Sequence, residues 1–497
     1  MITTHRLDDL LDGFDVSGLN TNPEIRNISL DSREVSPGGL FIALKGEQVD
    51  ARDFIPETME SGASAALIDA DELAPGSSEP GVMQNVIQVR NLRAVLSKIA
   101  ARFYNHPSHK LKVIGITGTN GKTTIAWYLA QVLDSVGISA GIMGTLGAGS
   151  VKTSNKTGIR LDATGLTTPD AVQVQKHLAQ MLEAGVEVVC MEVSSHGIAL
   201  GRINEVKFDT VVFSNISQDH LDFHHTMAQY AAAKMRLFEG SDFKRAVINK
   251  DDGLGREIIK NLGAKSYAYG INSGELRAFD IELAPHGLEF TVAISGESLS
   301  LNTSLIGQFN VYNMLAVLGT GQVLGYTLET LVAALELCEP VPGRMERIDE
   351  SPAQPVVVVD YAHTPDALEK ALTACRGHCR GSLSVVFGCG GDRDKSKRPE
   401  MGRIAQRLAD DVFITDDNPR GEQPAVITTD IKRGMTEPAW VLHDRAQAII
   451  AAIAKAQAQD WVLIAGKGHE TKQIYANKIV EFNDRVHARA ALERMAA

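Results

Sequence analysis

The sequence predicts an α/β protein of three domains: a small N-terminal α/β domain, a central parallel-sheet domain with a phosphate-binding loop, and a C-terminal doubly wound, Rossmann-like domain. Three observations lead to this fold class. A chain of 497 residues is too long for one ordinary hydrophobic core. Apolar segments of strand length alternate with helical patterns in its second and third parts, which is typical of parallel sheets covered by helices. A glycine-rich turn joins the first of these strands to a helix.

The predicted domains span residues 1–105, 106–340 and 341–497. The first has short apolar runs, such as Gly39–Leu44, broken by Gly, Pro and Asp. The second opens with an apolar strand at Leu111–Ile116 and a helix that reaches about Val136. The third begins at a Pro- and Gly-containing connection, Val341–Glu346, where the periodic patterns are interrupted.

Further strands are expected wherever a short apolar run is bounded by turn residues. In the central domain they are 186–193 and 208–214, and in the C-terminal domain 355–360, 383–388, 411–415 and 461–465. Helical patterns lie between the C-terminal strands, at 366–374 and 446–456. Both domains therefore present several strand ends at one edge of a sheet, which is where open α/β sheets bind ligands.

Composition limits the function classes. Charged residues make up 22% and apolar residues 44% of the chain, the balance of a folded soluble protein. The net charge of -12 argues against a nucleic-acid partner, because phosphate backbones are met by basic surfaces. The five cysteines suit reduced thiols in a cytosol, and Cys375, His378 and Cys379 lack the spacing and the second ligand pair of a zinc site. No signal peptide and no bilayer-length apolar run are visible, so we expect a cytoplasmic protein without membrane insertion.

The segment Gly118–Thr124 has the context of a phosphate-binding loop, because a strand precedes it and a helix follows it. Its glycines allow backbone N–H groups to approach phosphates, Lys122 is expected to reach the terminal phosphates, and the Thr123 hydroxyl can bind Mg²⁺. The usual spacing would place a glycine at position 116, where this chain has Ile116. We therefore predict a variant of the phosphate loop. A chance glycine turn is disfavoured because a strand, a helix and the Lys-Thr-Thr sequence occur together.

Two further groups stand at predicted strand ends. Glu192 closes an otherwise apolar strand, which makes it a natural Mg²⁺ ligand beside a phosphate loop. The alternative is a buried, hydrogen-bonded carboxylate, and either role requires a partner. His220 follows the next strand and is a second candidate ligand, although a lone loop histidine is more often structural.

Lys234 belongs to a helix that a capping box, Thr226 and Gln229, is expected to start. It stands four residues after Tyr230, on the apolar stripe formed by Met227, Tyr230, Leu237 and Phe238. An inward-facing ammonium is costly unless it is paired or chemically changed, so Lys234 is singled out.

These motifs resemble those of the Mur ligases, and most closely of the members that add diaminopimelate. The resemblance covers essentially the whole chain. The matching segments are Asp31–Arg33, Gly118–Thr124, Thr167–Asp170, Glu192–His196, Asp219–Asp222, Tyr230–Lys234, Gly307–Asn313, Gly343–Glu346, Asp360–His363 and Asp417–Arg420.

The resemblance implies an ATP-dependent, amide-bond-forming ligase of cytoplasmic peptidoglycan precursor synthesis. Its substrates would be ATP, a UDP-muramoyl dipeptide ending in D-glutamate, and meso-diaminopimelate, and the reaction would pass through an acyl phosphate. The three domains would bind UDP, ATP and the amino acid, in that order. Mg²⁺ would be the cofactor, and the lysine matching Lys234 is carbamylated in this family.

The resemblance also implies the site residues. Lys122, Glu192, His220 and Lys234 would be catalytic, and the metal would contact Thr123, Glu192, His220 and Lys234. The nucleotide would contact Gly118, Thr119, Asn120, Gly121, Lys122, Thr123, Thr124, Asn310, Asn313, Arg344 and Asp360. The UDP end would contact Leu30, Ser32, Glu47, Gln48 and Val49, and the muramoyl dipeptide would contact Thr167, Thr168, Ser194 and Arg202. Leu200 stands where some members have a polar contact. Diaminopimelate would contact Arg393, Asp417, Asn418, Pro419, Arg420, Gly466 and Glu470.

Three other functions are compatible with parts of this pattern: a lysine-adding Mur ligase, a folylpolyglutamate synthetase, and a nucleotide-dependent switch ATPase without ligase chemistry. The first 100 residues and the Asp417–Arg420 loop speak against both other ligases, since Arg420 is the family's version for diaminopimelate. A switch ATPase would need no amino-acid pocket at the C-terminal strand ends.

Overall fold

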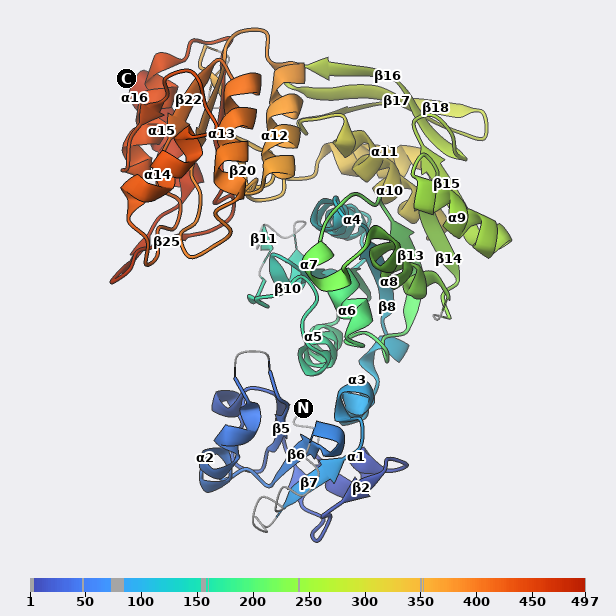
Figure 1. Ribbon diagram of the computed structural model, residues 1–497. Helices are drawn as coiled ribbons and strands as arrows, with labels where there is room; N and C mark the ends of the chain where they lie inside the picture. Colours follow the sequence, from blue (N-terminus) through green and yellow to red (C-terminus); the bar gives the residue numbers. More distant parts are fainter. Residues whose placement is uncertain are drawn as a thin grey trace. The chain divides into compact units, whose positions relative to one another are not determined.

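A computed structural model describes residues 4–46, 49–72, 85–152, 158–159, 161–239, 242–348, 351 and 353–496 (Figure 1). Glu47 and Gln48, two of the residues predicted to contact UDP, lie outside this part of the chain. The chain forms two compact units, one of residues 1–269 with 319–327 and one of residues 270–318 with 328–497. Among the described residues, no helix combines the length and the apolar character needed to cross a membrane.

The N-terminal segment forms the small α/β domain that the sequence predicts. Its sheet has the strand order β2-β7-β6-β5-β4, in which β4 to β7 are parallel and β2 is antiparallel. The strands are β2 Val16–Ser17, β4 Ile28–Ser29, β5 Leu40–Ala43, β6 Ala65–Asp69 and β7 Val86–Val89. Around them lie β1 His5–Arg6, α1 Leu7–Leu11, β3 Glu24–Ile25, α2 Ile55–Glu60 and α3 Leu92–Phe103. Apolar residues of α1 and α3 cover one face of this sheet and form its core.

The central sheet confirms the predicted parallel strands. In its parallel part the order is β9-β12-β8-β13-β14-β15, and β10 and β11 extend it in the antiparallel sense beside β9. The strands are β8 Lys112–Thr117, β9 Ala140–Gly144, β10 Gly147–Lys152, β11 Gly158–Ile159, β12 Val188–Glu192, β13 Phe208–Phe213, β14 Arg245–Asn249 and β15 Ser266–Gly270. The helices are α4 Lys122–Ser135, α5 Ala171–Glu183, α6 Ser195–Ala199, α7 Leu221–His224, α8 Met227–Glu239 and α9 Gly253–Leu262.

The position of β8 decides where the predicted motifs meet. This strand lies between β12 and β13 and is parallel to both. The loop after β8, the carboxylate at the end of β12 and the segment after β13 therefore share one edge of the sheet, although up to about 100 residues separate them in sequence.

The second unit contains an antiparallel meander and the C-terminal sheet. The meander consists of β16 Leu276–Ala284, β17 Gly287–Ile294 and β18 Glu297–Thr303. The C-terminal sheet has the order β19-β20-β24-β21-β22-β23, and β19 alone among these strands is antiparallel to its neighbour. Its strands are β19 Glu346–Ile348, β20 Val356–Asp360, β21 Leu383–Phe387, β22 Asp411–Ile414, β23 Trp440–Val441 and β24 Trp461–Ala465.

Helices cover both faces of the C-terminal sheet, as a doubly wound fold requires (Figure 1). Residues of α12 and α13 form the core on one face, and residues of α15 and α16 form the core on the other. The helices are α12 Pro365–His378, α13 Lys397–Leu408, α14 Pro424–Lys432, α15 Arg445–Lys455 and α16 Asp484–Ala496. A hairpin of β25 Lys472–Ile474 and β26 Ile479–Glu481 follows the last sheet strand. Two helices precede the C-terminal sheet in the chain, α10 Phe309–Val323 and α11 Leu328–Glu336.

His378 uses both ring nitrogens for backbone contacts in the second unit. Its Nε2 accepts a hydrogen bond from the Gly307 N–H at 2.9 Å, and its Nδ1 lies 2.6 Å from the Ala284 carbonyl, to which it donates. This pattern needs a neutral ring, and burial lowers the pKa of His378 accordingly. The histidine of the Cys375–Cys379 cluster is therefore engaged in holding backbone.

Candidate functional site

The phosphate loop has the backbone that its glycines predict. Gly118 and Gly121 have φ of 148° and 89°, the region that favours glycine. A Cβ atom on Gly118 would lie 1.9 Å from the Ser214 Oγ, so a side chain does not fit there. Helix α4 begins at Lys122, whose Nζ donates to the carbonyls of Gly118 at 2.9 Å and Thr119 at 2.8 Å. The loop thus presents a helix N-terminus and a folded-back ammonium, a combination suited to binding phosphate.

Glu192 lies beside this loop at the carboxyl end of β12, where it is 1% exposed. The Thr123 Oγ1 donates to its Oε2 at 2.9 Å. Thr145 donates twice, from its N–H to Oε1 at 2.8 Å and from its hydroxyl to Oε2 at 3.2 Å. The carboxylate therefore has the hydrogen-bond partners that a buried charge needs.

Lys234 points inward as predicted and is 1% exposed. Its Nζ donates to the Gly118 carbonyl at 2.8 Å, which is also a partner of Lys122, and lies 4.6 Å from the centre of the Tyr230 ring. Burial, reinforced by the Lys122 ammonium, lowers the pKa of Lys234 well below its usual range. A neutral, nucleophilic amine is thus favoured at the edge of the phosphate loop.

The helix that carries Lys234 agrees with the sequence except at its first residue. The Gln229 N–H donates to the Thr226 Oγ1 at 3.2 Å, as in a capping box. Tyr230, Leu237 and Phe238 are buried, but Met227 is exposed, so its place in the apolar stripe was wrong. Met227 is the first residue of helix α8, and the buried stripe begins one turn later at Tyr230.

His220 and Lys234 both lie beside the Tyr230 ring. It has a positive φ of 54°, and its ring is 4.7 Å from that of His196 and 6.0 Å from that of Tyr230. Burial lowers the pKa of His220, against the opposing effect of the Asp219 carboxylate, whose Oδ2 lies 3.5 Å from the His220 Nε2.

The donor set fits Mg²⁺ held partly by substrate. Across the described residues, no group of three or more His, Cys, Asp or Glu side chains forms a dedicated metal cage. Mg²⁺ is commonly held by one or two carboxylates together with nucleotide phosphates and water. Glu192 with the Thr123 hydroxyl beside the phosphate loop corresponds to that arrangement.

The residues predicted for the muramoyl dipeptide adjoin the same strand end. Thr168 donates from its hydroxyl to the Glu192 carbonyl at 2.9 Å and accepts from the Ser194 N–H at 2.9 Å. Arg202 donates to the Thr168 carbonyl at 2.8 Å, and the Thr167 hydroxyl lies 3.1 Å from that of Thr145. Leu200, where some family members have a polar side chain, is exposed.

A pocket of about 1160 Å³ contains the described residues predicted for the UDP end. Leu30, Ser32 and Val49 line it from the N-terminal domain, and Lys176 and His177 line it from helix α5. Its volume and mixed polar and apolar lining suit a nucleotide-sized ligand.

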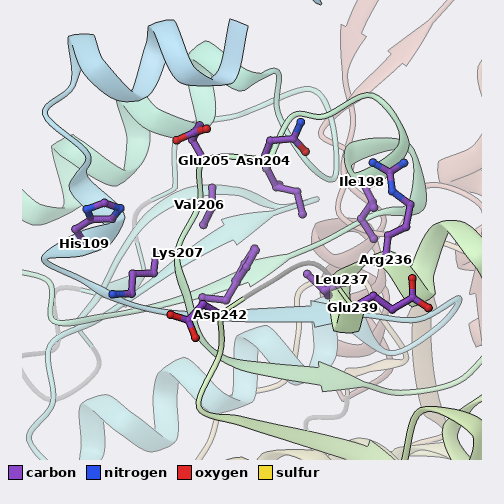
Figure 2. Close-up of a pocket in the computed structure, with 12 residues that line it drawn as sticks. His109, Ile198, Asn204, Glu205, Val206, Lys207, Arg236, Leu237, Glu239 and Asp242 are labelled. Atoms are coloured by element: carbon purple, nitrogen blue, oxygen red, sulfur yellow. The ribbon is translucent and has the colours of Figure 1, made fainter. Parts of the chain in front are cut away.

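A second pocket, of about 600 Å³, lies elsewhere in the first unit (Figure 2). His109 precedes β8, and Val206 and Lys207 precede β13, so this pocket is at the amino ends of the strands. It contains none of the predicted site residues, because the phosphate loop occupies the opposite, carboxyl edge.

In the second unit, the residues predicted near the nucleotide lie on α10, at the end of β20 and, for Arg344, in the turn before β19. Asn310 and Asn313 are buried on α10 and are joined by a 2.7 Å hydrogen bond. Asp360 ends β20 and accepts from the N–H groups of Met345 and Ala362, both at 2.8 Å. Burial raises the pKa of Asp360, and the Arg344 guanidinium, which lies over the Tyr361 ring at 5.0 Å, opposes that rise.

The residues predicted for the amino acid gather at the carboxyl ends of β22 and β24. Asn418 Nδ2 donates to Glu470 Oε2 at 3.1 Å. Gly466 has a φ of 121°, and a Cβ atom there would lie 2.6 Å from the Asp417 Oδ2. Burial raises the pKa of Asp417, against the opposing effect of Arg445 and Lys467.

Arg420 is tied to the neighbouring loop. Its φ is 50°, its N–H donates to the Ile474 carbonyl at 3.0 Å, and its Nη1 donates to the Gly391 carbonyl at 3.0 Å. Pro419 before it is buried, whereas Arg393 is exposed on the facing loop. A backbone carbonyl of the neighbouring loop therefore orients one side of the Arg420 guanidinium.

Two residues in these networks escaped the sequence reasoning. Thr145 holds Glu192 but is 47 residues distant from it, and no local pattern marks it. Lys467 lies inside the Gly466–Glu470 segment. Its position between two residues predicted to contact the amino acid, Gly466 and Glu470, could have marked it as part of the site.

Comparisons with known proteins agree with this geometry. Residues 24–104 match the Mur ligase family catalytic domain, residues 116–321 the Mur ligase middle domain, and residues 343–468 the Mur ligase glutamate ligase domain. A protein of Coxiella burnetii, named UDP-N-acetylmuramoyl-L-alanyl-D-glutamate--2,6-diaminopimelate ligase, is 41% identical over 98% of this chain and 99% of its own length. A protein of Xanthomonas campestris with the same name is 43% identical over 94% of both chains.

Solved structures give the same result. A structure described as UDP-N-acetylmuramoyl-L-alanyl-D-glutamate--2,6-diaminopimelate ligase is 35% identical, covers 95% of this chain and 96% of its own, and superposes with a TM-score of 0.68. MurF from Acinetobacter baumannii, at 20% identity and a TM-score of 0.66 over 99% of this chain, shares the fold. Three matched domains, and similarity that runs nearly from end to end, establish that the chain belongs to the Mur ligase family.

Proposed function

We propose that this chain is an ATP-dependent acid–amino-acid ligase that joins meso-diaminopimelate to the D-glutamyl residue of UDP-N-acetylmuramoyl-L-alanyl-D-glutamate. The observation that carries the proposal is the 41% identity, over 98% of the chain, to a relative named for this reaction. The reaction is a step of peptidoglycan precursor synthesis, and we place it in the cytoplasm, where its nucleotide substrates occur.

The phosphate loop supports the first half-reaction. The γ-phosphoryl group of ATP passes to the D-glutamyl carboxylate, which forms an acyl phosphate and releases ADP. Lys122 lies where its ammonium can exchange its loop carbonyls for phosphate oxygens and offset the charge that develops on them. Mg²⁺, when bound through Thr123 and Glu192, neutralises phosphate charge, and His220 and Lys234 complete the ligand set that we propose.

The surroundings of Lys234 support our proposal that it is carbamylated. A buried ammonium next to the Lys122 ammonium is unfavourable, and the lowered pKa leaves an amine that can add to CO₂. The resulting carbamate is an anion, so it turns repulsion by Lys122 into attraction. It also adds a second negative group to the metal site.

The second half-reaction uses the C-terminal domain. An amine of diaminopimelate attacks the acyl carbon, the C–N bond forms, the C–O bond to phosphate breaks, and the amine proton is lost. We assign Arg393, the Asp417–Arg420 loop, Gly466 and Glu470 to this substrate. We assign Asn310, Asn313, Arg344 and Asp360 to the nucleotide.

The domain assignments follow the same logic. Residues 1–105 bind UDP, through Leu30, Ser32 and the 47–49 segment, and residues 106–340 bind ATP. Thr167, Thr168, Ser194 and Arg202 bind the dipeptide within that central domain. Residues 341–497 bind the amino acid.

The test is phosphate release by the purified protein with every combination of ATP, the UDP-muramoyl dipeptide and an amine. We expect release only when all three are present, with diaminopimelate far better than lysine or ornithine. Release that needs no amine would indicate a switch ATPase. A preference for lysine would indicate the lysine-adding activity.

A further inference from the structure

Lys467 is the most fully buried ammonium in the described part of the C-terminal domain. Its side chain is 0% exposed, although it sits in the Gly466–Glu470 segment at the end of β24. A buried charge is costly and persists only where specific partners hold it. The partners of Lys467 therefore indicate what it does.

The two side chains to which Lys467 donates belong to residues that we assign to the amino-acid substrate. Its Nζ donates to the Asn418 Oδ1 at 3.0 Å and to the Glu470 Oε2 at 2.9 Å. Asn418 Nδ2 in turn donates to the same Glu470 Oε2 at 3.1 Å. The three side chains form a closed triangle that joins the loop after β22 to the loop after β24.

This triangle fixes which way the Asn418 amide faces. The Ile474 N–H also donates to its Oδ1, at 3.0 Å. Two obligate donors, an ammonium and a backbone N–H, converge on one atom, so that atom must be the amide oxygen. The NH₂ group then points toward Glu470 and retains one N–H for a further acceptor.

Because of the same contacts, the two oxygens of the Glu470 carboxylate have different surroundings. Oε2 accepts from Lys467 and Asn418, whereas Oε1 receives no hydrogen bond from the residues that the structure describes. Glu470 is also partly exposed, with a side-chain exposure of 32%. It therefore offers one oriented acceptor, and Asn418 offers one oriented donor.

We propose that Lys467 is a positioning residue that sets the polarity of the amine-donor site, so that Glu470 presents an acceptor for an ammonium and Asn418 a donor for a carboxylate. The proposal rests on the proposed function, because it concerns that function's amino-acid pocket. A zwitterionic amino-acid group requires one acceptor and one donor held in fixed relation. Without Lys467 the Glu470 carboxylate loses its charged partner and can rotate, and the Asn418 Oδ1 keeps only the Ile474 N–H among the two donors that now fix the amide.

The experiment compares Lys467→Met with the parent and with Lys472→Met. Methionine keeps an unbranched side chain only one atom shorter but removes the charge and both hydrogen bonds. Lys472 is exposed on β25, five residues along the chain, so Lys472→Met makes the same chemical change outside the triangle. Steady-state phosphate release gives separate KM values for diaminopimelate, ATP and the UDP-muramoyl dipeptide, and thermal unfolding checks that each variant is folded.

In Lys467→Met we expect the KM for diaminopimelate to rise by about tenfold to a hundredfold, as expected for misplaced binding groups. The other two KM values should stay within about twofold, and Lys472→Met should match the parent. A double-mutant cycle with Glu470→Gln should be strongly non-additive, because Lys467 acts through Glu470. If Lys467→Met does not fold, Lys467→Gln, which keeps one donor for the Asn418 Oδ1, takes its place with the same readouts.

The proposal is overturned if the KM for diaminopimelate is unchanged, if all three KM values rise together, or if the cycle is additive. A parent enzyme that shows no diaminopimelate-dependent phosphate release would instead overturn the proposed function. The two failures are therefore distinguishable.

Discussion

Replacing Arg420 with alanine should change which amine the enzyme accepts. Diaminopimelate and lysine differ by one carboxylate on the distal carbon, and a guanidinium can pair with a carboxylate through two parallel hydrogen bonds. Among the residues that the structure describes, the Arg420 guanidinium contacts carbonyl oxygens through its Nη1 alone, those of Gly391 at 3.0 Å and Asn418 at 3.4 Å. The side chain is thus held by one nitrogen, and the remaining N–H groups are available to a substrate carboxylate.

The magnitude follows from those hydrogen bonds. One bond to a charged group contributes about 1.5–3 kcal/mol, which corresponds to roughly tenfold to 150-fold in a specificity constant. We therefore expect Arg420→Ala to lower kcat/KM for diaminopimelate by that factor. For lysine, which lacks the carboxylate, kcat/KM should change by less than about threefold.

The assay is phosphate release with each amine at saturating ATP and UDP-muramoyl dipeptide. Arg433→Ala is the matched control, because Arg433 is an exposed arginine of the same domain that pairs with Asp430 at 2.6 Å. Arg420→Lys should recover only part of the loss, since an ammonium cannot form the two parallel bonds. Equal losses for diaminopimelate and lysine would refute the reasoning and would mean that Arg420 supports the loop through Gly391.

Three further predictions concern other groups. Lys234→Ala should lose most activity and regain part of it with small carboxylates, and ¹³C NMR of the parent in labelled bicarbonate should show a carbamate signal; full activity in the variant, or no such signal, would count against carbamylation. Glu192→Gln should keep the fold but lower turnover about 100-fold or more and shift the Mg²⁺ dependence, whereas an unchanged Mg²⁺ titration would make Glu192 structural. The Arg398 guanidinium lowers the pKa of Glu422 from 4.5 to about 2, so this pair stabilises the fold above pH 4.5 and its contribution is lost as the pH falls toward 2. Between pH 6 and pH 3, urea unfolding should therefore show a smaller decrease in the free energy of unfolding for Glu422→Gln than for the parent. If the free energy of unfolding changes equally with pH in both proteins, this contribution is excluded.

The fold was predictable wherever local pattern and topology act together. The strand before Gly118 and the helix after it are specified by adjacent residues, and the strands expected from apolar runs in the central and C-terminal domains agree with the structure to within two or three residues. The parallel strands β9, β14, β15 and β23 were not predicted. The meander of β16–β18 was not anticipated. It sits between segments of doubly wound pattern, and its strands are half exposed, which weakens the apolar signal.

The site was predictable where a residue ends a strand or lies on a helix stripe, as Glu192 and Lys234 do. Partners that come from distant elements were not predictable. Thr145 meets Glu192 because β9 pairs with β12, and Lys467 meets Asn418 because loops after β22 and β24 converge. Such contacts depend on sheet order, which no local spacing encodes.

The backbone contacts of His378 bear on how the protein can be divided into fragments. A C-terminal piece cut at residue 341 would separate this histidine from both Gly307 and Ala284, and would remove Ile306 from the core that includes Leu368 and Cys375. Two ring nitrogens would lose their partners in an apolar setting, at a cost of about 1–3 kcal/mol each. A fragment that starts before β16 keeps these groups together, so residues 270–340 are better retained than removed when the part that we propose to bind the amino acid is produced by itself for ligand screening.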